Sequence, residues 1–361
     1  MFKFEPRGLR SQFWSYGSPV LALLLTIVTT GILFAVMGKP PGVAVFTFLV
    51  EPLLDSNGIS ALAIKAAPLI MMGVGLSLCY RANVWNIGAE GQFTLGAIFG
   101  GGFALSFPDA PGWWLYPAVL LFGILGGAVW AAIVAWLKTS YNANEILTSL
   151  MLTYVAQLLL IYLVTGPWRD PKGFGFPQTA LFSDAATTPV IVEGTSIHLG
   201  CLVAPLMAIA VWLLMSKSVL GFQLRVVGEA PRAARFAGFK ESRLVWIALL
   251  ISGGLAGLSG VFEVTGPIGQ LTTSISPGYG FTAVIVAFLG RLHPIGCIFG
   301  GLLLALSYLG GNAAQIDLGL PNAVTGIFQG VLLFYLLGCD ILILFRLKRR
   351  RPVATVAGAM S

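Results

Sequence analysis

Long apolar stretches alternate with short polar stretches along almost the whole chain. Ten apolar runs stand out in the 361 residues, and most approach the roughly 20 residues that a helix needs to cross about 30 Å of hydrocarbon. Transmembrane barrels instead show an alternation of apolar and polar residues, which this sequence lacks. The pattern predicts an all-α, polytopic transmembrane helical bundle with spans near residues 19–37, 59–80, 87–107, 113–137, 144–165, 198–216, 244–264, 280–290, 294–311 and 321–345.

The run at residues 280–290 is too short to cross a bilayer as a straight helix. We therefore expect it to form half of a broken or re-entrant element. About ten spans follow if every run crosses. Eight follow if this run and a neighbour enter the membrane and return on the same side.

The composition supports one integral membrane domain over residues 1–361. Hydrophobic residues make up 57% of the chain and charged residues 10%, whereas a soluble domain carries about 25% charged residues. The net charge is +7, but the basic residues cluster in short segments beside apolar runs. That placement predicts that the basic segments lie beside the lipid bilayer and that the protein binds no nucleic acid.

The distribution of charge predicts the orientation. Three basic residues and one acidic residue lie in segment 1–18, six basic and two acidic in loop 217–243, and five basic residues in tail 346–361. Residues 166–197 instead hold two basic and three acidic residues. Because cytoplasmic loops are enriched in Lys and Arg, both termini and loop 217–243 are expected in the cytoplasm, and residues 166–197 outside.

No motif for chemistry is present. The sequence has no Walker A loop, nucleophile elbow or H-E-x-x-H motif, and its only histidines are His198 and His293. The cysteines are scattered without a C-x-x-C pair and are interpreted as small apolar fillers: Cys79, Cys201, Cys297 and Cys339. We predict no catalytic residue, no metal site and no enzyme activity, which leaves transport.

The stretch RANVWNIGAEGQ, Arg81–Gln92, concentrates polar residues between two apolar runs. Gly88 and Gly91 suit a break between two helical pieces. Polar residues in a bilayer usually face a cavity or a partner. We therefore hypothesise that Asn86, Glu90 and Gln92 line a translocation pathway for a neutral, hydroxyl-rich solute. Aromatic residues near span ends would complete the lining: Trp85, Tyr279 and Phe281.

A simpler alternative remains open for this stretch. It could be a cytoplasmic turn anchored by Arg81, with Glu90 in the first turn of the next helix, where the helix dipole favours a carboxylate. The aromatic residues have two interpretations as well. They could stack on a ring of the solute, or they could be interfacial and packing residues: Trp85, Phe93, Tyr279 and Phe281.

Other polar residues have local interpretations. Asn144 and Glu145 are typical of a helix start, with Asn at the N-cap and Glu in the first turn, and a pathway role is the alternative. Glu263, Arg291 and Asp317 lie near predicted helix ends, where solvation at the interface would suffice.

The basic loop contains a short helix signature. Pro231 suits the first position of a helix, and Gly238 suits the residue just beyond its end. About two turns with small residues lie between them, which would permit close docking. An ordinary basic loop is the alternative.

This loop carries a resemblance to a known family. VGEAPRAARFAGF is similar to the coupling-helix region of permease subunits of ATP-binding cassette importers, in the ribose, simple-sugar and nucleoside branch related to branched-chain amino acid permeases. RANVWNIGAEGQFTLGA, NANEILTSLMLTY and GYGFTAVIVAFLGRLHPIG resemble further motifs of this group, in the expected order. Together the motifs cover residues from about 59 to 340, and the first of them is most like the nucleoside-type permeases.

The resemblance implies a permease subunit for nucleosides or simple sugars in the cytoplasmic (inner) membrane. Its implied partners are an ABC ATPase subunit, a second permease in a heterodimer and an extracytoplasmic substrate-binding lipoprotein. The chain would need no cofactor, because the partner ATPase binds ATP. The implied ATPase contacts are Glu229, Pro231, Arg232, Ala233, Ala234, Arg235 and Gly238.

A different class, an ion-coupled secondary transporter or channel for a small polar solute, is the alternative. It would need an ion site, and Glu90, Glu263 and Asp317 form no cluster in the sequence. The coupling interpretation makes its own prediction. Bulky or acidic residues at Ala233 or Ala234 should abolish transport and leave the protein in the membrane.

Overall fold

The computed structural model describes residues 2–6, 12–192 and 194–349. The chain divides into two compact units, one of residues 1–45 with 326–361 and the other of residues 46–325. The expectation of a single membrane domain stays a prediction. Part of the predicted N-terminal segment and most of the basic tail, residues 350–361, lie outside the described residues.

The first unit contains two long helices. Helix α1, Gln12–Val36, is joined to α13, Ala323–Leu344, by the Ser18 hydroxyl, which donates to the Asp340 carboxylate across 2.8 Å. Two five-residue strands, β1 (Phe2–Pro6) and β2 (Phe345–Arg349), pair antiparallel.

The second unit holds the remaining helices. Helix α2, Pro41–Leu49, spans the boundary between the units. The α-helices of the second unit are α3 (Ser56–Arg81), α4 (Ala89–Ser106), α5 (Gly112–Tyr141), α6 (Glu145–Thr165), α7 (Leu199–Lys217), α8 (Val219–Glu229), α9 (Pro231–Phe236), α10 (Glu241–Glu263), α11 (Tyr279–Leu289) and α12 (Pro294–Leu318). Short turns η1 (Glu51–Leu53) and η2 (Asp184–Ala186) and the π-helix η3 (Val264–Ile268) complete it.

Within the described residues, eight helices are long and apolar enough to cross a membrane. They are α1, α3, α5, α6, α7, α10 with η3, α12 and α13, so the helical bundle expected from the sequence is confirmed. Two of the ten predicted runs, 87–107 and 280–290, form α4 and α11, which are not among the eight. Helix α4 carries Glu90 and Gln92 and is mostly buried, and α11 has only eleven residues.

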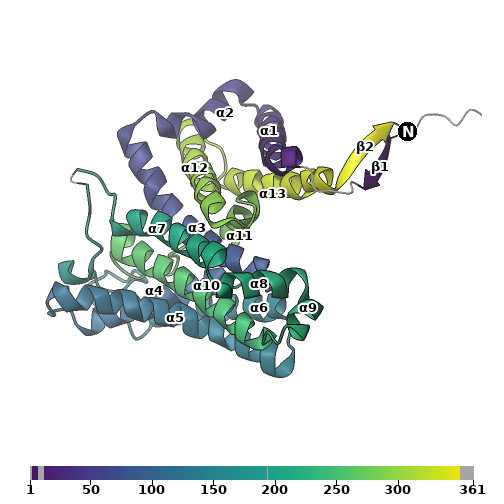
Figure 1. The fold of residues 1–361 in the computed structure, drawn as a ribbon. Helices are drawn as coiled ribbons and strands as arrows, with labels where there is room; N and C mark the ends of the chain where they lie inside the picture. Colours follow the sequence, from purple (N-terminus) through teal and green to yellow (C-terminus); the bar gives the residue numbers. More distant parts are fainter. Residues whose placement is uncertain (1, 7–11, 193, 350–361) are drawn as a thin grey trace, which may run out of the picture. The chain divides into compact units, whose positions relative to one another are not determined.

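Glycines bring α4, α5 and α10 into backbone contact (Figure 1). A Cβ atom on Gly96 of α4 would collide with the backbone of Gly257 in α10, and a Cβ on Gly257 would collide with the carbonyl of Gly123 in α5. Small residues of this kind allow helix axes to approach closely where lipid supplies no hydrophobic drive for association.

Helices α8 and α9 mark one end of the second unit, which we call the α9 end. A Cβ on Gly228 of α8 would collide with the carbonyl of Arg81, the last residue of α3. Trp246, near the start of α10, donates from Nε1 to the hydroxyl of Thr139, near the end of α5, across 3.0 Å. Helix α10 therefore starts at the end of the unit where α3 and α5 finish.

The segment 166–198 marks the opposite end, the loop end. The Tyr116 hydroxyl, near the start of α5, donates to Thr188 Oγ1 across 3.2 Å. Thr188 also bonds Thr265, just past α10, across 2.7 Å between the hydroxyl oxygens. Helices α5 and α10 thus run in opposite directions between the two ends.

After α10 and η3 the chain returns into the second unit without helical structure over residues 269–278 and then forms α11. Helix α11 leads to the α9 end, because Phe288 near its end stacks on Tyr80 near the end of α3, with ring centroids 5.6 Å apart. The short run 280–290 is therefore half of a broken element, as expected.

Candidate functional site

The polar stretch Arg81–Gln92 is the break between α3 and α4. Residues 82–88 are not helical, and Asn83 has a positive φ of 55°. A Cβ on Gly88 would lie 2.9 Å from the carbonyl oxygen of Ser149, so only a glycine lets the chain pass this close to α6.

Two side-chain amides hold the inner part of the break. Asn86 donates from Nδ2 to Gln92 Oε1 across 3.0 Å and to Ser252 Oγ across 3.1 Å. Gln92 donates back to Asn86 Oδ1 across 3.0 Å, and the Gly88 N–H donates to the same oxygen across 3.1 Å. Asn86 is 0% exposed and Gln92 1%, so both amides use their polar atoms inside the protein.

The contact with Ser252 places this network deep in the second unit. Ser252 lies eleven residues after the first residue of α10, Glu241, which corresponds to about 16 Å along the helix. Arg81 instead lies beside α8 at the α9 end. The stretch therefore begins as a turn at the α9 end and continues as a break inside the second unit, and its role in lining a pathway stays a prediction.

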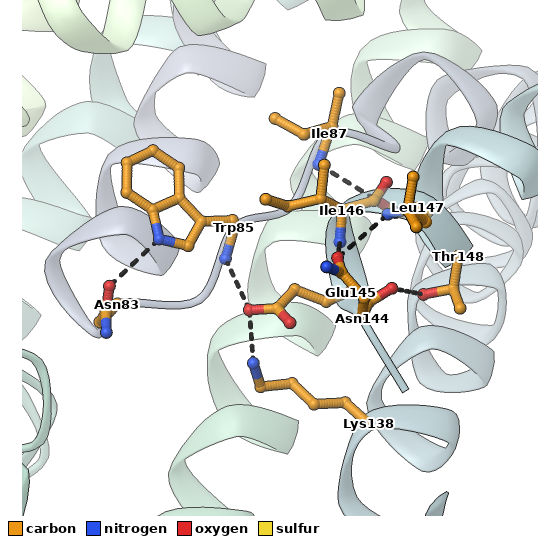
Figure 2. Close-up of polar contacts among 10 residues, drawn as sticks. Asn83, Trp85, Ile87, Lys138, Asn144, Glu145, Ile146, Leu147 and Thr148 are labelled. Carbon is orange, nitrogen blue, oxygen red and sulfur yellow. Dashed lines mark hydrogen bonds and ion pairs between the residues drawn. The ribbon is translucent and has the colours of Figure 1, made fainter. Parts of the chain in front are cut away.

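The outer part of the break is fastened to the start of α6, as Figure 2 shows. The Trp85 N–H donates to Glu145 Oε1 across 3.4 Å, and the Ile87 N–H donates to Ser149 Oγ across 3.2 Å. The ammonium of Lys138 forms an ion pair with the same Glu145 oxygen. Glu145 thus anchors the break to α5 and α6 at once.

Asn144 is the N-cap of α6, which confirms the predicted helix start (Figure 2). Its Oδ1 accepts the N–H groups of Ile146 at 2.9 Å and Leu147 at 3.3 Å. Satisfying these amides is the ordinary role of asparagine at a helix start.

The first turns of α4 and α11 meet inside the second unit. Glu90, which is 2% exposed, accepts the N–H of Gly280 at Oε2 across 2.6 Å. A Cβ on Gly280 would collide with the backbone of Glu90. The Ser276 hydroxyl accepts the N–H groups of Gly278 at 3.1 Å and Tyr279 at 2.9 Å.

This meeting has an electrostatic consequence. Each helix N-terminus carries a partial positive charge, and the Glu90 carboxylate lies in the first turn of α4 while it bonds the first turn of α11. Non-helical backbone is tolerated at such depth only where the protein or water satisfies its amides. Glu90 and Ser276 meet that requirement for the start of α11.

A second buried carboxylate lies next to the same helix start, in a group that we call the Lys65 cluster: Lys65, Glu263 and Tyr279. Lys65 Nζ donates to the Tyr279 hydroxyl across 2.6 Å and lies 3.6 Å from Glu263 Oε1. The Tyr279 hydroxyl donates to Glu263 across 3.4 Å. Glu263 is 4% exposed, so its interpretation as a solvated residue at a helix end is wrong.

Sequence reasoning did not single out Lys65. The signal was a lone basic residue inside the apolar run 59–80, which is costly in a bilayer unless it has a partner or a polar surface to face. Of the carboxylates considered for ion coupling, Glu90 and Glu263 both lie beside the start of α11, whereas Asp317 is exposed near the end of α12.

The aromatic residues of the hypothesis have different environments. Tyr279 is 0% exposed and lies edge to face with Phe93, with ring centroids 6.1 Å apart. Trp85 stacks on Tyr80 at 5.1 Å, and Phe281 is 39% exposed. Trp85, Phe93 and Tyr279 pack against neighbours, while Phe281 presents its ring at the surface. A pathway role for any of them stays a prediction.

Helix α9 has the start and the end that the sequence predicts. Pro231 is its first residue, and Gly238 has a φ of 77°. The Gly238 N–H donates to Arg235 O and the Phe239 N–H donates to Ala234 O, each across 3.0 Å, which is the Schellman pattern of a helix end.

Most of the predicted coupling residues are exposed around α9: Glu229, Pro231, Arg232, Ala233, Arg235 and Gly238. Ala234 is buried at 2% exposure, and Arg235 pairs with Glu241 across 2.9 Å. Phe236 was not among the predicted contacts, although it is 95% exposed. An aromatic ring in that position is typical of a surface that another protein covers.

Within the described ranges, no group of three or more His, Cys, Asp or Glu residues could hold a metal ion. The cysteines form no disulfide: Cys79, Cys201, Cys297 and Cys339.

Comparison with known proteins identifies the family. Residues 58–337 match the family described as branched-chain amino acid transport system / permease component. A glucose ABC transporter permease protein of Haloferax volcanii is 36% identical over 93% of this chain and 90% of its own length.

Two further relatives are named as permeases for nucleosides. A nucleoside ABC transporter permease protein of Lactococcus lactis subsp. cremoris is 25% identical over 88% of this chain and 89% of its own length. A guanosine ABC transporter permease protein of Bacillus subtilis is 28% identical over 75% of this chain and 78% of its own length.

The family match confirms the resemblance found in the sequence. Permeases of this family are non-catalytic membrane subunits that act with an ATPase and a substrate-binding partner. The match covers most of the chain, including the break, the start of α11 and α9. This chain therefore belongs to the permease-component family of branched-chain amino acid transport systems, as a multi-pass transmembrane subunit of an ABC transporter.

Proposed function

We propose that this chain is part of the translocation unit of an importer for simple sugars or nucleosides. In this proposal, α9 binds a separate ATPase and transmits its conformational changes to the membrane helices. The names of the relatives support this solute class. Both kinds of solute are neutral and rich in hydroxyl groups. The glucose permease has the highest identity of the three, so D-glucose is the first solute to test and guanosine the second.

The exposed surface of α9 is the observation that carries the proposal. The helix is short, fixed at both ends by Pro231 and the Gly238 turn, and it presents Phe236 and Ala233 outward. A rigid helix with an exposed aromatic residue beside a small one suits insertion into a groove of a partner. The exposed arginines Arg232 and Arg235 add donors for carboxylates at the edge of that groove.

The charge pattern supports a matching topology. The α9 end and both termini face the cytoplasm, and the loop end faces outward, where an extracytoplasmic lipoprotein delivers the solute. The membrane is the cytoplasmic (inner) membrane, and a second, different permease subunit completes the translocation unit. ATP is bound by the ATPase subunit, and this chain requires no cofactor.

The pathway residues divide into two roles in this proposal. Asn86, Glu90 and Gln92 hold the two helix breaks that border the route, because their polar atoms bond within the protein. Of the aromatic residues, Phe281 is exposed and lines the route, whereas Trp85, stacked on Tyr80, and the buried Tyr279 support the breaks.

Co-purification of the ATPase tests the proposal. The full transporter is expressed with a tag on this chain, and Phe236→Asp is compared with Phe174→Asp, because Phe174 is 98% exposed on the segment of the loop end. We expect the ATPase to co-purify with the wild type and with Phe174→Asp, and to be lost from Phe236→Asp. ATP-dependent uptake of D-glucose or guanosine should disappear in Phe236→Asp, and Phe174→Asp serves as the control for co-purification.

The opposite results would overturn it. Retention of the ATPase and of uptake in Phe236→Asp would show that α9 does not couple the subunits. Uptake that survives ATP depletion but collapses with a proton uncoupler would favour the ion-coupled alternative.

A further inference from the structure

We propose that the Lys65 cluster is a hydroxyl-binding site for the passing solute, in which the Lys65 ammonium donates to a hydroxyl oxygen. The inference rests on the proposed function and deepens it. It adds Lys65 and Glu263 to the route and names the chemical group that they recognise.

The depth of Lys65 is the first observation. Helix α3 has 26 residues, and Lys65 is the tenth, so its Cα lies about 13 Å along the helix from the first residue and about 24 Å from the last. An ammonium at this position in an apolar helix is costly unless it faces a partner or a water-filled space.

The ammonium is held toward the interior of the second unit. Its Nζ lies 2.6 Å from the hydroxyl of Tyr279, a residue with 0% exposure, and 3.6 Å from the carboxylate of buried Glu263. A lysine that extended to the membrane interface would leave both partners. The Lys65 side chain is nevertheless 32% exposed, and we assign this surface to the route.

The hydrogen-bond count leaves one donor for the solute. A lysine ammonium has three N–H donors and no acceptor. In the part of the chain that the structure describes, one donor of Lys65 serves Tyr279, and even with a second assigned to the ion pair with Glu263 at 3.6 Å the third remains. The Tyr279 proton goes to Glu263. Lys65 is thus the member of the cluster that combines an exposed side chain with an unused donor.

The charges of the cluster select neutral solutes. Lys65 and Glu263 compensate each other, and the Glu90 carboxylate is engaged by the start of α11. An incoming cation would meet the ammonium, and an incoming anion would displace Glu263 from it at the cost of leaving a buried carboxylate unpaired. A hydroxyl oxygen accepts the free N–H without either penalty. Sugar rings and ribose both carry such oxygens.

A second ion pair supplies a matched control. Lys138 and Glu145 also pair within the second unit, but Glu145 accepts the Trp85 N–H and anchors the break. That pair lies at the α9 end, and among the described residues its hydrogen bonds and ion pair do not reach the start of α11. Its neutralisation should affect stability without changing the recognition of hydroxyl groups.

The test combines neutral variants with deoxy solutes. The full transporter is reconstituted in liposomes with Lys65→Met/Glu263→Gln, which removes both charges and leaves neither buried partner ionised alone. Uptake is measured for D-glucose, guanosine and their single-deoxy analogues. In the wild type, loss of the contacted hydroxyl should lower kcat/KM about tenfold, the usual scale for a hydrogen bond to a charged group.

The expected result is a loss of discrimination. In Lys65→Met/Glu263→Gln the parent solute and its deoxy analogue should have equal kcat/KM, with the loss appearing as a higher KM, while ATPase co-purification is retained. The control Lys138→Met/Glu145→Gln should discriminate as the wild type does. Should the double variant fail to assemble, Lys65→Arg keeps the charge and moves the donor, and it is expected to change which deoxy analogue is disfavoured.

Two kinds of outcome would overturn the inference, and they are distinguishable. Discrimination equal to the wild type in Lys65→Met/Glu263→Gln, or an unchanged deoxy pattern in Lys65→Arg, would show that the cluster is only structural and would leave the proposed function intact. A wild-type transporter that moves neither D-glucose nor guanosine would refute the proposed solute class, and this inference with it.

Discussion

The carboxylate of Glu90 accepts the backbone N–H of Gly280 across 2.6 Å, although 190 residues separate them in the chain. The bond joins the first turn of α4 to the first turn of α11. Both turns follow non-helical segments inside the second unit, at residues 82–88 and 269–278. One acidic side chain therefore offsets the positive ends of two helices where water cannot do so.

Replacing Glu90 tests this arrangement. Glu90→Ala leaves the Gly280 N–H without an acceptor and should destabilise the transporter by about 1–3 kcal/mol, the usual cost of an unsatisfied buried group. Glu90→Gln keeps an acceptor of the same size and should cost less. Thermal unfolding of the detergent-solubilised complex measures both, and equal Tm values for all three proteins would contradict the capping role.

The contact between α10 and α5 predicts a contrast between two glycines of one helix. A Cβ on Gly257 would collide with the carbonyl of Gly123, which belongs to the backbone and cannot move aside. A Cβ on Gly254 would instead lie 3.3 Å from the Ile124 Cγ2 methyl and 3.9 Å from the Ile124 carbonyl oxygen. Gly257→Ala should cost about 1–3 kcal/mol, as overpacking does.

Gly254→Ala is the matched control. It should be neutral or stabilise α10 by up to about 1 kcal/mol, because alanine is the better helix former. Tm values of the two variants in the same detergent decide the matter. A Gly257→Ala variant as stable as Gly254→Ala would show that the helices can separate without cost.

Local rules made several features predictable from the sequence. The N-cap at Asn144 and the limits of α9 depend on a few neighbouring residues, and the structure has them where the pattern indicated. The helix break after Arg81 was signalled by glycines and polar side chains within twelve residues.

Features that depend on packing were not predictable in the same way. Lys65 and Tyr279 are 214 residues apart, and nothing local to either indicates that they meet. The same reason explains the error on Glu263, whose place at the end of α10 suggested solvent until α3 and α11 covered it. Most of the run 87–107 is helical, but its Gly96 and Gly100 serve contact with α5 and α10.

The N-cap of α6 predicts a graded effect. Asn144→Ala removes the acceptor for the N–H groups of Ile146 and Leu147 and should cost about 1 kcal/mol. Asn144→Asp keeps the acceptor and should preserve stability. The Tm of each purified complex checks this, and a loss with Asn144→Asp as large as with Asn144→Ala would rule out capping as the role.

Adjacent alanines of α9 should respond differently. Ala233 is exposed, so Ala233→Glu should leave the amount of folded protein unchanged and abolish ATP-driven uptake. Ala234 is 2% exposed, so Ala234→Leu should first disturb the packing of α9 and lower the amount of folded protein. The sequence-based expectation treated the two residues alike. Membrane levels and uptake, measured together, separate them, and full uptake in Ala233→Glu would count against a coupling role.

The environment of His198 predicts a loss of stability in acid. Its Nδ1 accepts the Gly200 N–H across 3.1 Å at the start of α7, and its buried Nε2 has no hydrogen-bond partner among the described residues. Burial lowers the pKa of His198 to about 4. Below the ordinary histidine pKa of about 6.5, His198 binds a proton in the unfolded chain but stays neutral in the folded chain.

The stability contributed by neutral His198 is therefore complete above about pH 6.5 and is lost as the pH falls toward 4, by about 3 kcal/mol at most. His198→Asn keeps an acceptor for the Gly200 N–H but cannot titrate, so its Tm should decline less than that of the wild type between pH 7 and pH 4.5. His293→Asn, which removes the other histidine, is the control for general acid effects. If His198→Asn and the wild type lost the same Tm over this range, the proton would have to bind elsewhere.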